Sequence, residues 1–590
     1  MPDDYAKLVA EAFIDPIRSV LIVDDDYPTL NEILLERSTG QASEEHAKKS
    51  WRANPDGVLA VVREFRSAEG RPYILDIHDG EAPPSGTDER QAHRLQQTDL
   101  LVLDYELNGA IRDGGRKAIA IAREALTNDH FNLILVHTRE PLEVVFDQFL
   151  LGLLRPLEPQ QADAEHEQVI DDHLDALLEF VTDQAYLEYR RPGRIGDDTP
   201  SGPLVQLMTA LEAVREGPPR EAVLGEAIAE YERRAIREAR FADRDVGVRA
   251  WRSDGVTWIR CDQGFVAFKQ KGDGIPLIQT LKETLASWRP FPSRLLLTKL
   301  RAEMNERGIE VQDDALGDRT VGAAWFHEMV AAPESFRGTR VEEVIRNHSE
   351  QLLDQLLPRV ANYAQKLVGA FPTDANDAVA QAFDGFDLTK QETKIHAVIG
   401  RNAFAASKPV GGVHLEFGHI LEVAGGFWAC MTPACDMVPG RHRNLEYELD
   451  DAKGRKRFVA LRLHDIDAAK LNKVVKSAQN ADHAFVNIAG DDGTTTATVF
   501  GLTRPGVAAP ATMTMYADDD GLFPEGAKRL TIRYILTECH PDDTSGGVVP
   551  TVIEETATVR GHLRYEYALH IQSLMTSGQS RIGLDFSNLK

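Results

Sequence analysis

The sequence predicts a multidomain fold that combines α/β, α and β architecture: an N-terminal doubly wound parallel sheet, a helical middle region and a C-terminal β-rich, barrel-like domain. Near the N-terminus, short runs of leucine, isoleucine and valine end in polar residues, which is typical of buried parallel strands. Apolar residues three and four apart between residues 277 and 368 indicate helices. Short alternating segments with glycine turns follow from about residue 411 and indicate strands.

The first strands are expected at residues 21–23, 100–103 and 133–136, and each leads into oxygen-bearing side chains. Asp24 and Asp25 follow the first run, Asp104 follows the second and Thr138 follows the third. In doubly wound sheets the ligand site lies beyond the carboxyl ends of the strands. We therefore expect these four side chains to meet at one edge of the sheet.

This ordered set resembles the receiver domain of two-component response regulators, over roughly the first quarter of the chain. The resemblance implies that Asp24 and Asp25 hold Mg²⁺, that Asp104 is the phosphoacceptor of a phosphorelay, and that Thr138 is the switch hydroxyl that bonds the phosphate. Hard oxygen ligands suit magnesium, and the cation offsets repulsion between phosphate and carboxylate.

The sequence departs from the receiver pattern in one functional residue. Receivers place a lysine after the fifth strand, whereas no lysine occurs here between Lys117 and Lys269, so we expect this lysine to be missing. An arginine is not an equivalent replacement for a compact ammonium group. A degenerate receiver used for docking is therefore the preferred interpretation, with phosphorylation of Asp104 as the alternative. Aspartates that only cap the following helix are the purely structural alternative.

The remaining chain is divided by composition and periodicity. A Pro/Gly-rich segment at 191–203 is the clearest linker, and tight-turn signals between residues 248 and 269 predict a small antiparallel sheet. The expected domains are a receiver-like domain at 1–160, a helical connector at 161–245, a small β module at 246–272, a helical region at 273–390 and a β-rich domain at 391–590.

Composition and charge narrow the classes of partner. A formal net charge of −27 opposes general binding to nucleic acid, which depends on lysine and arginine displacing counterions. No apolar run approaches the roughly 20 residues that span a membrane, and the first residues lack the features of a secretory signal. Four cysteines do not form a disulfide framework. We expect a soluble, cytoplasmic protein, and homodimerisation is left open.

The C-terminal part offers a weaker second candidate site. Zinc binding would use thiolate and imidazole groups, but four residues between the first two cysteines is wide for a zinc pair, so Zn²⁺ is not expected. A nucleophilic cysteine, Cys435 oriented by Asp436, is the catalytic alternative. The candidate residues of this site are Cys430, Cys435, Asp436, His442, Cys539 and His540.

Taken together, these observations predict a response-regulator-like signalling protein of a bacterial two-component or anti-phage conflict system. It is expected to act by regulated protein–protein interaction, with a histidine-kinase-type ATPase or sensor protein as partner and Mg²⁺ at the receiver site as an open question. The alternative is a receiver-controlled effector enzyme, a hydrolase or nuclease, with its site in the C-terminal domain. Motifs for phosphate loops, nucleophile elbows and zinc proteases are absent from the sequence, which favours a role without catalysis.

Overall fold

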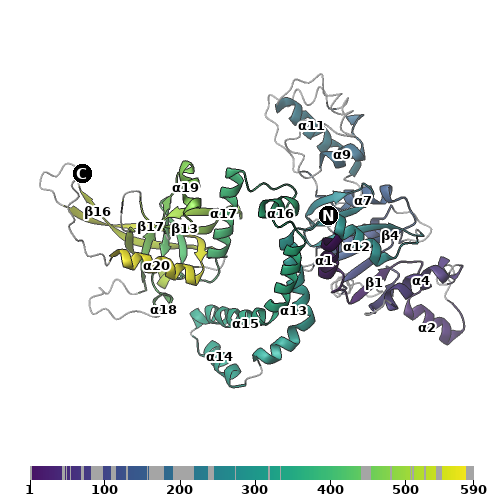
Figure 1. Cartoon of the computed structure of the whole chain (residues 1–590), viewed down its shortest axis with the longest axis horizontal. Helices are drawn as coiled ribbons and strands as arrows, with labels where there is room; N and C mark the ends of the chain where they lie inside the picture. Colours follow the sequence, from purple (N-terminus) through teal and green to yellow (C-terminus); the bar gives the residue numbers. More distant parts are fainter. Residues whose placement is uncertain are drawn as a thin grey trace. The chain divides into compact units, whose positions relative to one another are not determined.

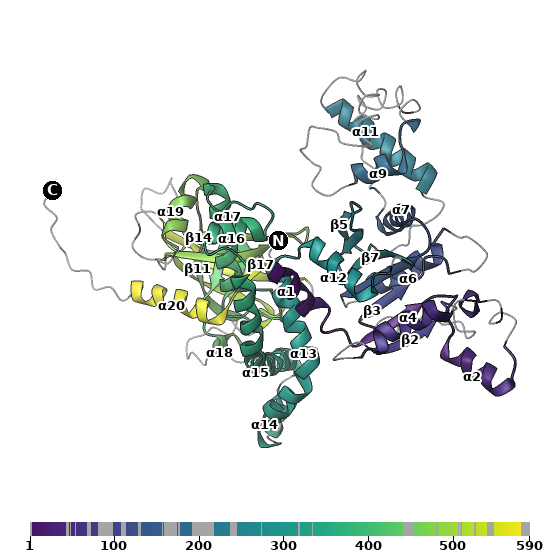
Figure 2. The same ribbon diagram turned by 45° about the vertical axis from the view of Figure 1, so that its right-hand side comes forward.

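The computed structural model divides the chain into two compact units (Figures 1 and 2). The N-terminal unit comprises Met1–Glu306 and Val360–Ala370, and the C-terminal unit comprises Arg307–Arg359 and Phe371–Lys590. The structure describes residues 3–42, 47, 49–53, 55–67, 72–80, 98–107, 114–127, 131–155, 157, 174, 178–190, 218–236, 245–272, 274–316, 319–332, 334–439, 454–478, 482–504, 507, 510–523, 527–539 and 548–579. The predicted linker at 191–203 lies outside these residues.

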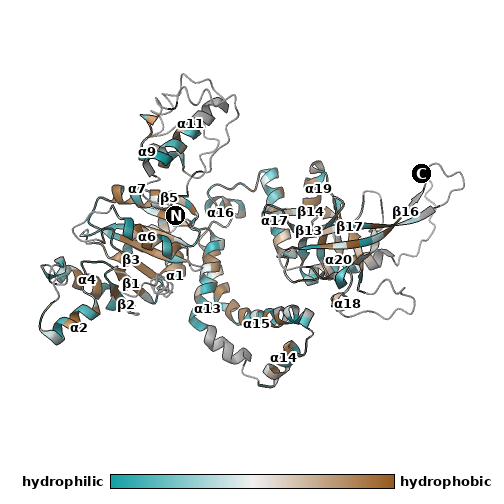
Figure 3. Ribbon diagram, turned by 180° about the vertical axis from the view of Figure 1, so that it is seen from behind, coloured by the Kyte–Doolittle hydropathy of each residue, from teal (hydrophilic) through white to brown (hydrophobic). Residues whose placement is uncertain are grey.

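A seven-stranded sheet forms the centre of the N-terminal unit, in the order β2-β1-β3-β4-β7-β6-β5. Five of its strands are parallel, and β5, β6 and β7 are joined as antiparallel neighbours. Its strands are β1 (Ser19–Val23), β2 (Ile74–His78), β3 (Leu100–Leu103), β4 (Asn132–Thr138), β5 (Val248–Arg252), β6 (Trp258–Cys261) and β7 (Gly264–Gln270). β3 and β4 are buried along their whole length, as the apolar runs predicted, and the strands are coloured mainly hydrophobic in Figure 3.

The strands expected as a separate β module at 246–272 belong to this sheet. β7 pairs with β4 in parallel register, with Leu133 opposite Phe265 and Thr138 opposite Gln270. The tight turns were predicted, but turn chemistry reports only the local antiparallel hairpins and not the non-local partner of the last strand. β7 is therefore the fifth parallel strand of the N-terminal sheet, in the order 2-1-3-4-5 of one common doubly wound fold.

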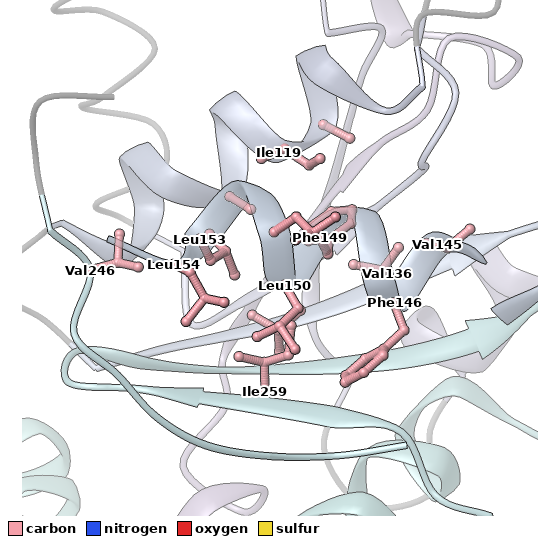
Figure 4. Close-up of a cluster of buried hydrophobic side chains, with 14 of the residues drawn as sticks. Ile119, Val136, Val145, Phe146, Phe149, Leu150, Leu153, Leu154, Val246 and Ile259 are labelled. Carbon is pink, nitrogen blue, oxygen red and sulfur yellow. The ribbon is translucent and has the colours of Figure 1, made fainter. Parts of the chain in front are cut away.

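Helices cover this sheet and pack through apolar stripes. In α7, Phe146, Phe149 and Leu150 lie three and four residues apart, and the rings of Phe146 and Phe149 contact the ring of Phe268 on β7. The three residues belong to one buried cluster with Val136 of β4 and Ile259 of β6 (Figure 4). The same cluster extends to α9 and α11, which belong to the segment inserted between α7 and β5. The helices of this unit are α1 (Asp3–Phe13), α2 (Leu30–Thr39), α4 (Pro55–Arg66), α6 (Arg116–Leu126), α7 (Leu142–Leu153), α9 (Asp183–Tyr189), α11 (Pro218–Tyr231) and α12 (Leu277–Trp288).

The middle region is helical, as predicted, with α13 (Pro292–Leu316), α14 (Arg319–Ala331), α15 (Glu334–Gly369) and α16 (Ala375–Ala382). Pro358 lies inside α15, and the helix continues through it although proline removes one helical hydrogen bond. The boundary between the two units falls at the next peptide bond, after Arg359.

A closed antiparallel barrel of six strands forms the centre of the C-terminal unit, which confirms the predicted fold class. The chain of neighbours β16-β15-β11-β10-β9-β17 is closed by pairing of β16 with β17. Its strands are β9 (His419–Val423), β10 (Gly426–Cys430), β11 (Lys456–Arg462), β15 (Thr512–Ala517), β16 (Arg529–Cys539) and β17 (Val548–Leu563), with the short β8 (Ser407–Lys408) beside β17.

Leu421 and Val423 belong to the core inside the barrel, whereas Ile420, which alternates with them, packs outside. Outside the barrel lie a three-stranded sheet and helices, which together bury a second and a third apolar cluster. These elements are β12 (His464–Asp465), β13 (His483–Ala489), β14 (Thr495–Gly501), α17 (Gln391–Ala406), α18 (Ala434–Met437), α19 (Leu471–Lys476) and α20 (Tyr565–Gln579).

No helix among the described residues combines the length and the apolar character needed to cross a membrane.

Candidate functional site

Three carboxylates converge at the carboxyl edge of the N-terminal sheet. Asp24 and Asp25 follow β1 and Asp104 follows β3, and one oxygen of each carboxylate lies within 4.8 Å of the others. β1 and β3 are neighbouring parallel strands, and the backbone N–H of Asp104 continues their pairing by donating to the carbonyl of Val23 at 2.8 Å. The strand ends that the sequence predicted are therefore adjacent in the fold.

Lys271 brings a cation into this pocket. Its Nζ lies 2.8 Å from Oδ2 of Asp24 and 3.0 Å from Oδ1 of Asp104. It follows β7 directly, and its backbone N–H donates to the carbonyl of Thr138 at 2.6 Å, so the parallel pairing of β4 and β7 fixes its position. Lys271 thus stands after the fifth parallel strand, and the expectation that this lysine is missing is wrong.

Thr138 ends β4 at the same edge of the sheet. Its side chain is buried, and its hydroxyl oxygen accepts the backbone N–H of Glu140 at 3.0 Å. That bond uses the acceptor side of the hydroxyl, so the hydroxyl proton is directed elsewhere. Asp24 is ordered in a similar way, because its Oδ1 accepts the backbone N–H of Asp26 at 3.0 Å while Oδ2 accepts Lys271.

The pocket has an excess of negative charge in a poorly solvated place. Burial and the neighbouring carboxylate of Asp24 raise the pKa of Asp104 to about 7, although Lys271 opposes the shift. The carboxylates of Asp24 and Asp104 raise the pKa of Lys271 despite its burial, so the lysine is a permanent cation. Three carboxylates against one ammonium group leave a net negative charge, which a divalent cation with oxygen ligands would neutralise.

A hollow of about 740 Å³ adjoins this pocket, and Lys271 lines it. It lies between α4 and the start of α12, and its wall includes Tyr27, Trp51, Arg139 and Lys269. Burial, followed by the charge of Asp24, raises the pKa of Tyr27 to about 12, so this phenol is neutral.

Lys271 was missed because its distance in sequence from β4 was read as a domain boundary. The signal was present: residues 264–268 form an apolar run that ends in Lys269-Gln270-Lys271-Gly272, which is the same pattern of buried strand and polar end as at Asp24 and Asp104. Because a glycine turn precedes this run, the local sequence pattern is also that of an isolated hairpin.

Of the C-terminal candidate residues, the structure describes the side chains of Cys430, Cys435 and Asp436. Cys430 belongs to the barrel core, where burial raises the pKa of its thiol to about 12, and such a thiol is a poor nucleophile and ligand. Cys435 is exposed in α18, with its Sγ 3.7 Å from Asp436 Oδ1. Within the described part of the chain, no group of three close ligands includes a cysteine. His442 and His540 lie outside the described residues, as does the side chain of Cys539.

A parallel sheet in the order 2-1-3-4-7, with a carboxylate cluster and a lysine at its carboxyl edge, defines a receiver-type domain. Residues 16–185 match the response receiver domain family. The N-terminal domain is thus receiver-like, and the protein has a response-regulator-like signalling role. The matched segment ends before β7, so Lys271 enters the site from outside it. A search of curated proteins and a search of solved structures each returned no match.

Proposed function

We propose that the N-terminal domain is a phosphorylatable receiver in which Asp104 accepts a phosphoryl group with the help of Mg²⁺. The observation that supports this is the position of Lys271, whose Nζ contacts both Asp24 and Asp104. Burying charged side chains has a large desolvation cost. A receiver that no longer accepts a phosphoryl group would gain nothing from a buried lysine at this point, so the presence of Lys271 favours an active receiver.

In the proposed reaction, a carboxylate oxygen of Asp104 attacks the phosphorus of a donor. The P–N bond of a phosphohistidine, or the P–O bond of an acyl phosphate, breaks as the new P–O bond forms, and the electron pair leaves with the donor. Asp24 and Asp25 would hold Mg²⁺, which neutralises the transferring group. Lys271 would exchange Oδ1 of Asp104 for a phosphoryl oxygen, and the free proton of the Thr138 hydroxyl would bond a second one.

The raised pKa of Asp104 fits this role. A carboxylate held in a desolvated, negatively charged pocket is destabilised as an anion, and phosphorylation or the arrival of Mg²⁺ relieves that cost. A movement of Lys271 would shift the end of β7 and the start of α12, because these two elements flank the lysine in the sequence. We infer that a change in this region alters the surface offered to a partner protein.

The partner class follows from the chemistry. Receiver domains interact with kinases and other proteins, and a histidine-kinase-type phosphodonor supplies the P–N bond that the reaction requires. The hollow beside Lys271 opens at this edge and is a suitable place for a donor side chain to enter.

A role of the protein in an anti-phage conflict system is a further proposal. Loss of protection from phage in a strain that carries Asp104→Asn is the test.

Incubation of the full-length protein with acetyl phosphate and Mg²⁺, followed by intact mass measurement, tests the proposal. We expect one added phosphoryl group in the wild type, none in Asp104→Asn, and normal labelling in Asp76→Asn, which removes an exposed carboxylate from β2. A label that survives in Asp104→Asn contradicts the assignment of the acceptor. If neither acetyl phosphate nor a phosphorylated histidine-kinase domain labels the wild type, the domain is a degenerate receiver.

A further inference from the structure

A second cluster of ligand-type side chains lies at one end of the C-terminal barrel, distant in sequence from the receiver pocket. It consists of Glu416, His419 and His562, and one ligand atom from each lies within 4.8 Å of the others. Oε2 of Glu416 is 3.9 Å from Nε2 of His562, and the two imidazole rings are 4.1 Å apart between centroids. Both histidines are buried, and the Glu416 carboxylate is the partly exposed member.

A β-bulge places the two histidines opposite each other, with their rings in an edge-to-face arrangement. His419 begins β9 and shares the inward face of the strand with Leu421 and Val423. On β17, a register shift between Val559 and Gly561 places His562 directly opposite His419. Without that extra residue, alternation would send His562 to the outer face.

The bulge is firmly held. Its extra residue, Arg560, bonds the carboxylates of Glu422 and Asp491 at 2.7 Å each. A side chain at Gly561 would meet the carbonyl oxygen of Asn487 at 2.8 Å, so only glycine fits after the bulge. Such bulges commonly re-aim a side chain at a functional position.

His419 supplies an independent sign that a ligand belongs here. Its side chain is fully buried, and among the residues that the structure describes its Nε2 has no hydrogen-bond partner. Leaving such an atom without a partner costs about 1–3 kcal/mol, so native proteins rarely do it without a reason. Burial lowers the pKa of His419 well below its usual value and that of His562 to about 3, so both rings are neutral. Neutral imidazole is the form that coordinates metals.

We propose that Glu416, His419 and His562 form a binding site for a divalent transition metal of the zinc type. Two imidazoles and one carboxylate match the preferences of borderline cations, whereas Mg²⁺ and Ca²⁺ prefer oxygen ligands throughout. Ligands at about 2.0–2.2 Å from zinc stand up to about 4 Å apart, which is close to the 3.9 Å between Oε2 of Glu416 and Nε2 of His562. Nε2 of His562 donates to the carbonyl of Phe417 at 3.2 Å, so coordination through this atom requires that it give up this bond and its proton. Three protein ligands leave a fourth position on the side of Glu416 that solvent reaches.

Binding of a metal through Nε2 of His419 requires the proton of its neutral ring to move from Nε2 to Nδ1. Nδ1 of His419 accepts the backbone N–H of Glu416 at 3.0 Å, which places the proton of the neutral ring on Nε2. Coordination through Nε2 needs the other tautomer, so Glu416 must give up this bond as its carboxylate moves to the metal. Gly412 and Gly418 flank the segment with φ of +78° and +88°, and glycine tolerates the backbone changes that such a move requires.

The test is zinc titration of full-length, chelator-stripped protein against a chromophoric competitor, with excess Mg²⁺ present to occupy the receiver carboxylates. We expect one tight zinc equivalent in the wild type and in His570→Ala, which removes an exposed histidine of α20. Loss of an outer partner of a ligand already weakens metal binding by about 10–100-fold, so His419→Ala should weaken zinc binding by more than about 100-fold. X-ray absorption at the zinc edge should show nitrogen and oxygen neighbours.

Unchanged zinc affinity in His419→Ala, sulfur ligands in the absorption spectrum, or no tight zinc in the wild type would each overturn the proposal. If His419→Ala does not fold, Glu416→Gln gives the decision, because its side chain is partly exposed and the substitution keeps its shape. That variant should keep its circular dichroism spectrum and bind zinc at least about 10-fold more weakly. Full affinity in Glu416→Gln contradicts the site.

Discussion

At the scale of single residues, Lys271 decides how the receiver pocket is interpreted. The sequence placed Asp24, Asp25, Asp104 and Thr138 at strand ends, because a local apolar run followed by a polar residue is visible without knowledge of the fold. Lys271 has the same local pattern, but its role depends on the pairing of β7 with β4, which is a non-local fact. The composition of the pocket could therefore be predicted for the carboxylates and not for the cation.

Replacement of Lys271 by alanine should destabilise the N-terminal unit in a way that Mg²⁺ repairs. Breaking a buried ion pair costs about 3–5 kcal/mol, and proton uptake by Asp104 recovers part, so we expect a loss of about 2 kcal/mol in the free energy of unfolding. Since Mg²⁺ can replace the lost cation, its addition should stabilise Lys271→Ala more than the wild type. Urea unfolding with and without Mg²⁺ measures this, and Lys282→Ala on the exposed face of α12 is the control. Equal Mg²⁺ effects in both proteins would contradict the electrostatic account.

Asp147, which is half-buried on α7, gives a prediction with a defined pH dependence. Burial and the charges of Asp183 and Glu143 raise its pKa to about 6, so the folded protein binds this proton more tightly than the unfolded chain. Stability from this residue is therefore fully present below about pH 4 and is lost as the pH rises through about 6.

Asp147→Asn removes the charge and should stabilise the protein at pH 7. The full shift corresponds to about 3 kcal/mol, which we reduce to about 1 kcal/mol because solvent reaches the group. At pH 4 the variant and the wild type should unfold at the same urea concentration. Glu179→Gln, at an exposed acid of the same unit, should show no such pH-dependent difference.

At the scale of elements, the sequence predicted the kind of structure well and the pairing of distant strands poorly. The runs ending at Asp24, Asp104 and Thr138 became β1, β3 and β4, and the turn between β9 and β10 lies at residues 424 and 425, directly before Gly426. Closure of the barrel depends on β16 meeting β17 and on β9 meeting β17, contacts that no local pattern encodes. For the same reason the cluster of Glu416, His419 and His562 was not predicted, because residues 419 and 562 become neighbours only through that pairing.

The start of α6 is sensitive to a single methyl group. Gly115, the N-cap of α6, has φ of +71°, and a Cβ there would overlap the ring of Tyr105, the residue after Asp104. Gly40, the C-cap of α2, has φ of +73°, but a Cβ at this position would meet no atom within 4 Å, so Gly40 isolates the cost of the backbone conformation.

Gly40→Ala should therefore cost about 1 kcal/mol, from left-handed backbone strain alone. Gly115→Ala should cost at least about 3 kcal/mol, because overpacking adds to that strain. Chemical denaturation measures both values. Displacement of Tyr105 should also slow labelling of Asp104 by acetyl phosphate, whereas Gly40→Ala should be labelled normally. Equal stability losses in the two variants would show that Tyr105 is free to move aside.

At the scale of the whole molecule, the two units carry different chemistry and should respond to different conditions. The N-terminal unit holds the carboxylate pocket that we propose binds Mg²⁺, and the C-terminal unit holds buried histidines whose pKa values burial lowers. Burial lowers the pKa of His414 to about 4, that of His562 to about 3 and that of His419 well below its usual value. Because the unfolded chain binds these protons at a pKa of about 6.5, stability is present above that pH and is lost as the pH falls below it.

Differential scanning calorimetry of the full chain in the presence of a chelator should separate these responses. At pH 5 each of His414, His419 and His562 should cost about 2 kcal/mol relative to pH 7, so the barrel transition should fall by several degrees for a total of about 6 kcal/mol. His414→Gln should reduce this pH dependence by about a third. Replacing the chelator with Mg²⁺ at pH 7 should raise only the transition of the N-terminal unit, because a ligand stabilises the unit that binds it. A single transition that shifts with both treatments would mean that α13 and α15, each shared by the two units, couple their unfolding into one cooperative step.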